Sequence, residues 1–358
     1  MNIEKVKSIA DAVLYEGYIL YPYRPSAIKN QQRWNFGGVY PKRFSEMQKG
    51  TDAWQMQTQC LIEADEKTTL DIKIRFLQMV MRGVREPKES FDKDNFNESD
   101  FQGVQALQVG EQLFQSWQEA VEREFNIKTV KLNELVGKTK EQKFSFEENQ
   151  ETEILKNEEN KVGGIIVRSN EFIEGAVEVS VEDLSEQVEL KSKKLFKVTV
   201  RILNKGNFAD DETRDEALMR AFVSTHTILN VKSGGFVSLL EPTEKFENVA
   251  KTCENIGTYP VMVGDEGERE FLFSSPIILY DYPQIAPESE GNYFDGTEMD
   301  EMLALRIMTL TDDEKHQMRG ADERTRQMLE RTETMSPEMM MKLHGRTSNL
   351  SRKEENDK

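Results

Sequence analysis

The apolar positions of this chain follow two different periods. Polar and apolar residues alternate over residues 54–62, 70–76, 177–181 and 196–202. A period of two is typical of strands with one buried face, and antiparallel sheets commonly bury only one face. We therefore predict a largely antiparallel β core, in which a first β region (residues 1–85) packs with a second β region (residues 162–295).

Short polar segments lie between these runs and indicate where the chain turns. Residues 65–67 read Asp-Glu-Lys, and residues 230–236 contain a Gly-Gly pair between apolar runs. Segments of this kind are typical of turns between strands, and we expect one at each place. We also expect a strand over residues 271–279, and a short helix over residues 3–12 that leads into a strand over residues 13–23.

The pattern between the two β regions is different. Leu107, Phe114, Trp117, Val121 and Phe125 are spaced close to the period of a helix. We predict an inserted amphipathic helix over residues 104–125. Residues 137–161 are rich in Lys, Glu, Asn and Gln, which indicates a charged linker or a polar helix. Residues 86–161 are therefore expected to hold an amphipathic helix plus a charged linker.

The last part of the chain carries signals for the start of helices. Thr297 is followed by Asp300 and Thr311 by Glu314, which resembles a capping box, and Ser336 precedes a proline at a first helical turn. We predict a helical segment over residues 296–345 and a disordered tail over residues 346–358. Strands followed by helices, without regular alternation, favour an α+β fold.

Composition limits the classes of function. The chain has 358 residues and a net charge of -18, which disfavours nucleic acid as a partner because phosphate binding depends on Lys and Arg. No stretch approaches the ~18 apolar residues needed to span a membrane, and the N-terminus lacks the pattern of a signal peptide. We therefore expect a cytoplasmic protein with no membrane span.

Catalytic and cofactor motifs are absent from the sequence. The glycine patterns of nucleotide sites, the serine-hydrolase elbow and paired Cys-x-x-Cys motifs are not found, so we expect no cofactor and lean towards a protein that is not an enzyme. His226 could join Cys253 and a carboxylate as a transition-metal site. The alternatives are a buried, hydrogen-bonded histidine and a cysteine that packs as a small apolar residue.

Two segments of opposite charge are the strongest candidates for a working surface. The basic segment (residues 17–45) has no Asp or Glu and mixes basic with aromatic residues, whereas the acidic segment (residues 270–305) has no Lys or Arg. They could meet inside the fold, where Asp281 would neutralise a buried arginine, or they could form a partner surface, a ligand cleft or a metal site. The candidate binding residues are Tyr23, Arg24, Lys29, Asn30, Arg33, Trp34, Asp281, Tyr282, Glu288, Asp295 and Glu298.

Both segments also carry a family resemblance. Residues 14–24, 29–34, 275–289, 294–301 and 305–315 are similar to an uncharacterised bacterial protein family encoded in the operons of high-affinity nickel–iron uptake hydrogenases. The likeness covers both ends of the chain and is weak over residues 85–165. The resemblance implies an accessory or assembly role beside a hydrogenase, and it implies no catalytic residues.

Three hypotheses follow. The first is a non-catalytic accessory or assembly protein that binds another protein, such as a nickel–iron hydrogenase subunit or precursor. The second is an enzyme or metal-handling protein with an unrecognised site, built from Arg24, Arg33, Asp281, Glu288 and His226. The third is a structural role for the same residues. The sequence leaves the oligomeric state and the exact partner open.

Overall fold

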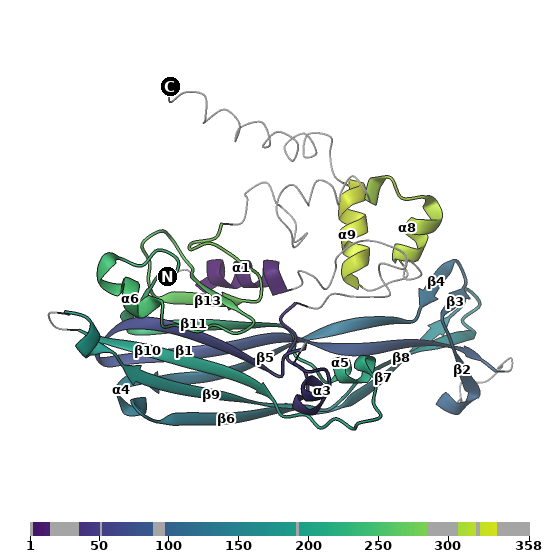
Figure 1. Ribbon diagram of the computed structural model, residues 1–358. Coiled ribbons are helices and arrows are strands. Elements are labelled where there is room, and N and C mark those ends of the chain that lie inside the picture. Colours follow the sequence, from purple (N-terminus) through teal and green to yellow (C-terminus); the bar gives the residue numbers. More distant parts are fainter. Residues whose placement is uncertain are drawn as a thin grey trace.

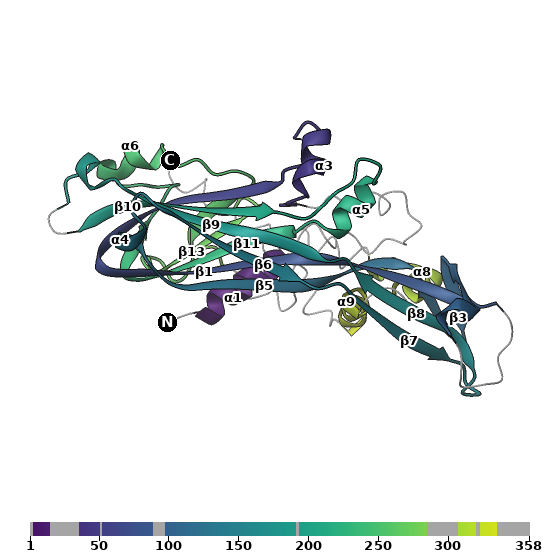
Figure 2. The same cartoon turned by 90° about the horizontal axis from the view of Figure 1, so that it is seen from below.

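A single long strand organises the protein. The computed structural model describes residues 3–14, 36–50, 52–88, 97–190, 193–284, 307–319 and 323–334. Strand β1 (Gln55–Pro87) is 33 residues long and runs through most of the molecule (Figure 2). Every strand that pairs with it is antiparallel, so the predicted antiparallel β core is confirmed.

The two edges of β1 are filled by successive partners. One edge pairs first with β10 (Lys194–Asn204), then with β5 (Trp117–Lys131) and finally with β2 (Phe101–Val104). The opposite edge pairs with β11 (Val223–Val237) and then with β8 (Val162–Asn170). Over residues 61–64, most of 69–77 and most of 81–85, β1 is therefore paired on both edges.

The remaining strands extend this arrangement outwards. Strand β9 (Ile173–Asp183) pairs with β10, and β6 (Thr139–Phe146) pairs with β9. On the other side β13 (Phe271–Ser275) pairs with β11, and β12 (Tyr259–Met262) pairs with β13. Strand β7 (Asn149–Lys156) pairs with β8, whereas β3 (Ala106–Val109) and β4 (Gln112–Gln115) form a separate hairpin.

The main core lies between two layers of this branched sheet. Figure 1 shows β11 and β13 above β9 and β6, with β1 and β10 between them. Alternate side chains of β1, including Ile72, Ile74 and Phe76, point into this space and are buried with the valines of β9. The ring centroid of Phe222 lies 4.7 Å from that of Phe76 and 5.4 Å from that of Phe144. The alternation predicted for residues 70–76, 177–181 and 196–202 is therefore correct.

The chain does not reverse at either of the two predicted turns, because both segments lie at one irregularity in the pairing of β1 with β11. Residues 65–67 and 230–236 lie within β1 and β11, where the register shifts between Ala64 and Thr69. The hydroxyl of Thr68 donates to the carbonyl of Ser233, whose φ is 57°. A Cβ on Gly234 would lie 3.0 Å from the carbonyl oxygen of Glu63, so the close approach favours glycine. The expectation of turns is wrong because a β-bulge uses the same residues as a turn.

The predicted amphipathic helix over residues 104–125 is also wrong, because these residues form β3, β4 and part of β5. Trp117, Val121 and Phe125 are four residues apart, a spacing that places side chains on one face of a helix and equally on one face of a strand. Leu107 and Phe114, seven apart, are direct cross-strand partners in the β3–β4 hairpin. The helical spacing therefore arose from a strand and a hairpin.

The charged linker expected over residues 137–161 is likewise replaced by strands β6 and β7. Each pairs with another strand along one edge, and most of their side chains are exposed. Charged residues on an edge strand hinder pairing with other molecules. The Lys- and Glu-rich composition is thus explained by the position of these strands at the margins of the sheet.

The described helices are short and lie around the sheet. Helix α1 (Ile3–Leu14) covers one face of the sheet and ends two residues later than predicted. The strand expected from residue 13 therefore does not begin there. The rest of that expected strand, residues 15–23, lies outside the described residues. The predicted helix start at Thr311 is confirmed by α8, whereas the starts at Thr297 and Ser336 and the tail 346–358 lie outside the described residues. The other helices are α3 (Lys42–Met47), α4 (Leu132–Leu135), α5 (Arg214–Met219), α6 (Glu247–Ala250), α8 (Asp312–Arg319) and α9 (Glu323–Thr334), with 3-10 turns Glu98–Asp100, Ser185–Gln187 and Glu244–Phe246.

Helices α8 and α9 occupy the far end of the molecule from α6 (Figure 1). Helix α8 contacts β4, and Glu333 of α9 forms ion pairs with Lys315 and Arg319 of α8. Among the described residues, no helix has the length and apolar character that a membrane crossing requires. Helices α8 and α9 therefore pack against each other, and α8 packs against the β3–β4 hairpin through β4.

The aromatic cluster at the centre of the core gives a test of the packing. In Gly175→Ala the new methyl group would lie 2.5 Å from Phe144 Cζ and 2.8 Å from Phe222 Cζ. We expect a loss of about 1–3 kcal/mol in the free energy of unfolding, measured by urea denaturation, because overpacking displaces both rings. Gly83→Ala in β1 is the control, since its nearest neighbour would be 3.9 Å away. Equal effects in the two variants would contradict the packing described.

Candidate functional site

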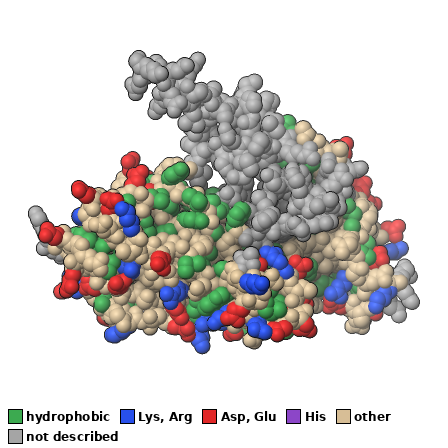
Figure 3. Space-filling view, in the orientation of Figure 1, with side chains coloured by type: hydrophobic (Ala, Val, Ile, Leu, Met, Phe, Trp, Pro, Cys, Tyr) green, Lys and Arg blue, Asp and Glu red, His purple; other side chains and the backbone are tan. Residues whose placement is uncertain are grey.

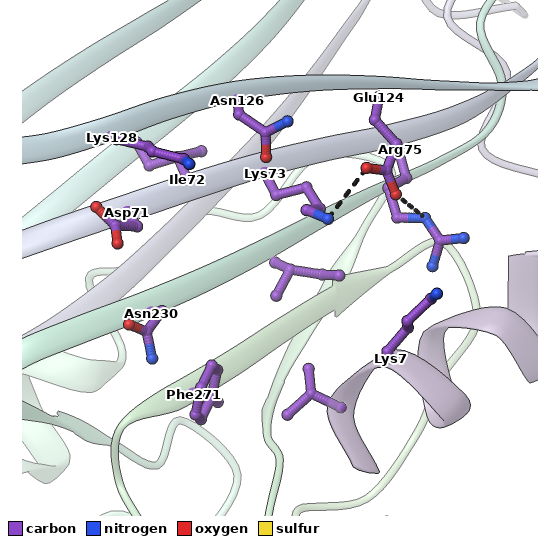
Figure 4. A pocket seen from close by; sticks show the side chains of 12 residues that line it. Lys7, Asp71, Ile72, Lys73, Arg75, Glu124, Asn126, Lys128, Asn230 and Phe271 are labelled. Carbon is purple, nitrogen blue, oxygen red and sulfur yellow. Dashed lines mark hydrogen bonds and ion pairs between the residues drawn. The ribbon is translucent and has the colours of Figure 1, made fainter. Parts of the chain in front are cut away.

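A groove lies between helix α1 and the outer face of strands β5, β1, β11 and β13. Its volume is about 530 Å³. Val6, Ile228 and Phe271 provide apolar surface, and Asn126 and Asn230 provide amide groups. Figure 4 shows the charged side chains that share the lining, which are Lys7, Asp71, Lys73, Arg75, Glu124 and Lys128.

The sheet register places these side chains together. Odd-numbered residues of β1 face the groove, because their even-numbered neighbours point into the main core. Arg75 is directly opposite Glu124 of β5 and His226 of β11. Lys73 is opposite Asn126 and Ile228 in the same way. The floor of the groove therefore consists of matched rows on three strands, in which Ile228 is the one apolar residue of those named.

Arg75 is the centre of an ion cluster. Its side chain is 4% exposed and forms ion pairs with Asp11 at 2.6 Å, Glu122 at 3.2 Å and Glu124 at 3.2 Å. Asp11 belongs to α1, so this pair ties the helix to the sheet. A buried guanidinium without carboxylates would be very costly, and the three partners meet that need.

The other charges in the groove are unevenly matched. Glu124 also pairs with Lys73 at 3.0 Å, and Asp71 pairs with Lys232 at 2.8 Å. Lys7 and Lys128 are exposed, and neither makes an ion pair with any residue of the described ranges. Each carboxylate in the lining thus has a cation beside it, while the ammonium groups of Lys7 and Lys128 contact no carboxylate of the described residues.

His226 lies under this cluster and is fully buried. Its Nδ1 is 2.6 Å from the carbonyl oxygen of Ser224, and its ring stacks on Phe273 with centroids 5.2 Å apart. Burial, reinforced by the charge of Arg75, lowers the pKa of His226 to about 3. The ring is therefore neutral at physiological pH and donates from Nδ1 to the Ser224 carbonyl. Its Nε2 has no hydrogen-bond partner among the described residues.

Cys253 occupies a different setting. It packs against a cluster that includes Leu61 and Phe246, and burial raises the pKa of its thiol to about 11. Within the described part of the chain, no three residues of the types His, Cys, Asp and Glu are grouped so that they could hold a metal ion. The geometry thus matches the alternative interpretations of His226 and Cys253, as a buried histidine and a small packed side chain.

Asp281 and Tyr282 hold the segment that follows β13. The carboxylate of Asp281 accepts hydrogen bonds from the Ser238 hydroxyl and, at 2.7 Å, from the backbone N–H of Met262. Tyr282 donates its backbone N–H to the Met262 carbonyl at 2.8 Å and its hydroxyl to the Glu268 carbonyl at 3.0 Å. Both residues therefore fasten this segment to the β12–β13 hairpin.

The expected strand over residues 271–279 is shorter than predicted. Strand β13 ends at Ser275, directly before Pro276, which lacks the N–H group that a sheet ladder uses. Ile277 and Leu279 pack against the cluster beneath α1, whereas Ile278 is 70% exposed and Tyr280 is 84% exposed. The segment thus buries alternate side chains and presents the others outwards.

The described parts of the basic and acidic segments touch each other. Gly37, with φ at 56°, lies so close to Pro276 that a Cβ would be 2.6 Å from its ring. Two basic residues of the same segment contact other parts of the fold instead: the ammonium group of Lys42 lies over the ring of Trp54, and Arg43 forms an ion pair with Asp210 at 2.8 Å. The remaining candidates lie outside the described residues, and these are Tyr23, Arg24, Lys29, Asn30, Arg33, Trp34, Glu288, Asp295 and Glu298.

Sequence reasoning did not identify the Arg75 cluster. The signal was present, because Asp71, Lys73 and Arg75 alternate with apolar residues and must share the opposite face of the strand. Such a face is normally solvated, so it gave no reason to expect burial. Burial depends on α1, which lies more than sixty residues earlier in the sequence.

Comparisons with known proteins add no assignment to this geometry. A scan against protein-family models finds no matching family, and a search of curated proteins finds no match. Function is therefore inferred from the contacts of the described residues and from the resemblance at the two ends of the chain.

Replacing Arg75 tests the ion cluster. We expect Arg75→Met to lower the free energy of unfolding by about 2–5 kcal/mol, because three carboxylates lose their common partner. Lys73→Met is the matched control on the same face; Lys73 is 39% exposed, and loss of such a pair costs about 0–1 kcal/mol. Urea denaturation of both variants gives the comparison. Similar losses in the two would show that burial of Arg75 is not decisive.

His226 makes stability depend on pH. Its pKa is 6.5 when unperturbed and about 3 in the fold, so the unfolded chain takes up the proton first as pH falls. The stabilisation is complete above pH 6.5 and decreases towards pH 3, by about 2 kcal/mol between pH 7 and pH 5.

The variant His226→Phe isolates this contribution. It keeps a ring against Phe273 and cannot titrate, so its free energy of unfolding should lose about 2 kcal/mol less than the wild type between pH 7 and pH 5. Other titrating groups are common to both proteins and cancel in the difference. Parallel pH profiles would show that the pKa of His226 is the same in the folded and the unfolded chain, which would contradict the prediction.

Proposed function

We propose that this protein is a non-catalytic accessory protein that binds another protein, with a nickel–iron hydrogenase subunit or precursor as the partner. The observation that carries the proposal is the pair of outward-facing side chains Ile278 and Tyr280 on a fastened segment. Large apolar side chains with 70% and 84% exposure gain most from a partner that covers them.

The segment that holds this pair is fixed on both sides. Ile277 and Leu279 point inwards against the cluster beneath α1, and Asp281 and Tyr282 bond to the β12–β13 hairpin. Two residues apart on an extended chain, Ile278 and Tyr280 point the same way. A surface that is already ordered loses little conformational entropy on binding, and this favours affinity.

The surroundings and the residue types also suit an interface. Tyrosine is enriched at binding hot spots, where its ring is buried and its hydroxyl finds a partner. Tyr259 of the edge strand β12 is 46% exposed and is paired with Ser275, close to the start of the segment. Figure 3 shows hydrophobic side chains over the part of the surface that contains β13 and α6.

The partner class comes from the resemblance. Residues 275–289 are among the stretches similar to the hydrogenase-operon family, and Ile278 and Tyr280 belong to that stretch. Asp281 and Tyr282 act in the proposal as anchors that present their neighbours. In the proposal, Asp281 and Tyr282 therefore position the segment, and Ile278 and Tyr280 make the contact with the partner.

Affinity purification tests the proposal. The tagged full-length protein, expressed in a host that carries the native hydrogenase operon, should recover a hydrogenase subunit or precursor. The double variant Ile278→Ser/Tyr280→Ser should reduce recovery about tenfold or more, because each hot-spot residue contributes on the order of 1–2 kcal/mol.

Ile154→Ser is the control, since Ile154 is 46% exposed on β7 and lies outside the segment. Thermal melting confirms that each variant is folded. Recovery of no hydrogenase component by the wild type, or equal recovery by the double variant, would contradict the proposal.

A further inference from the structure

We infer that the groove beneath α1 binds an amphiphilic carboxylate, a ligand with an apolar body and a single carboxylate group. The inference is independent of the proposed partner protein, because it rests on the lining of the groove alone.

The charge of the groove favours an anion. Asp71 and Glu124 are each held by a cation, at 2.8 Å from Lys232 and 3.0 Å from Lys73. Lys7 and Lys128 have no carboxylate in contact within the described ranges, although the charge of Lys128 acts on Asp71. Within the lining, four basic side chains (Lys7, Lys73, Arg75 and Lys128) outnumber the two carboxylates of Asp71 and Glu124, and this local excess of positive charge favours an anionic ligand.

The apolar lining specifies the rest of the ligand. Val6 of α1, Ile228 of β11 and Phe271 of β13 form one wall. Figure 4 shows Lys7 and Lys128 on different sides of the groove, with Phe271 near Asn230. A volume of about 530 Å³ is within the range of small-molecule sites, in which apolar contacts give affinity and a few polar groups give orientation.

A carboxylate fits this lining better than a phosphate. Arg75 is the one guanidinium in the lining, and it is already engaged by Asp11, Glu122 and Glu124. A dianionic phosphate would also meet the carboxylates of Asp71 and Glu124 in the same groove. A single negative charge can be met by one lysine, with the amide of Asn126 or Asn230 as a second donor.

Such a carboxylate could be a free acid or the C-terminus of a peptide, and two probes separate these sources. Octanoate and the peptide acetyl-Ala-Leu-Leu-Ala with a free C-terminus are titrated into the full-length protein by calorimetry. Octanol and the same peptide as its C-terminal amide are the uncharged counterparts. The inference is supported if the affinity for an acid is about tenfold or more higher than the affinity for its uncharged counterpart.

Variants locate the binding. Lys7→Gln and Lys128→Gln remove exposed charges that have no ion-pair partner among the described residues, so folding should be retained. The double variant should weaken acid binding about fivefold or more. Lys140→Gln is the control, because Lys140 is exposed on β6, in the other layer.

Each outcome of these titrations either supports or overturns the inference. Preference for octanoate identifies a free acid as the ligand, and preference for the peptide acid identifies a C-terminus; both support the inference. Binding of neither acid at millimolar concentration, equal binding of the uncharged counterparts, or binding unchanged in the double lysine variant would overturn it. None of these results depends on recovery of a hydrogenase component.

Discussion

The alternation of side chains along β1 imposes one constraint on the whole structure, because over residues 70–80 the side chains on both faces of this strand are buried or half-buried. Ile72, Ile74 and Phe76 meet the main core, and Arg75 on the opposite face is also buried, beneath α1. A strand that is covered on both faces and paired on both edges has little freedom of register, since a slip by one residue would place Arg75 in the apolar core. The positions of β11, β5 and α1 all follow from that register.

The sequence predicted strands correctly where one face of the strand is buried and the alternation of polar and apolar residues continues over many residues. The valines of β9 and the apolar residues of β10 gave correct strands, because their outward neighbours are polar. It failed where one spacing serves two structures: Trp117, Val121 and Phe125 lie on one face of a strand as well as of a helix. It also failed at the bend of β1, because a bulge and a turn require the same small and polar residues.

The candidate site was predictable only in part. The motif that contains Asp281 and Tyr282 was singled out from the sequence as a candidate binding segment, and in the structure these residues form hydrogen bonds with Met262 and Glu268. The groove and the Arg75 cluster could not be foreseen. They depend on contacts between α1, β5 and β11, and a single sequence carries no signal that these distant segments meet.

The pairing of β1 also has a consequence for the way in which the protein is made. Gln59 of β1 bonds to Thr199 of β10, 140 residues later. At ribosomal rates of about 5–20 residues per second, Gln59 is synthesised roughly 7–28 seconds before Thr199. During that interval the edge of β1 that pairs with β10 has no native partner, and the apolar side chains of the strand are not yet covered. The nascent chain therefore depends on chaperones or on transient local structure to avoid aggregation. The long central strand that unifies the finished protein is thus the part most exposed during its synthesis.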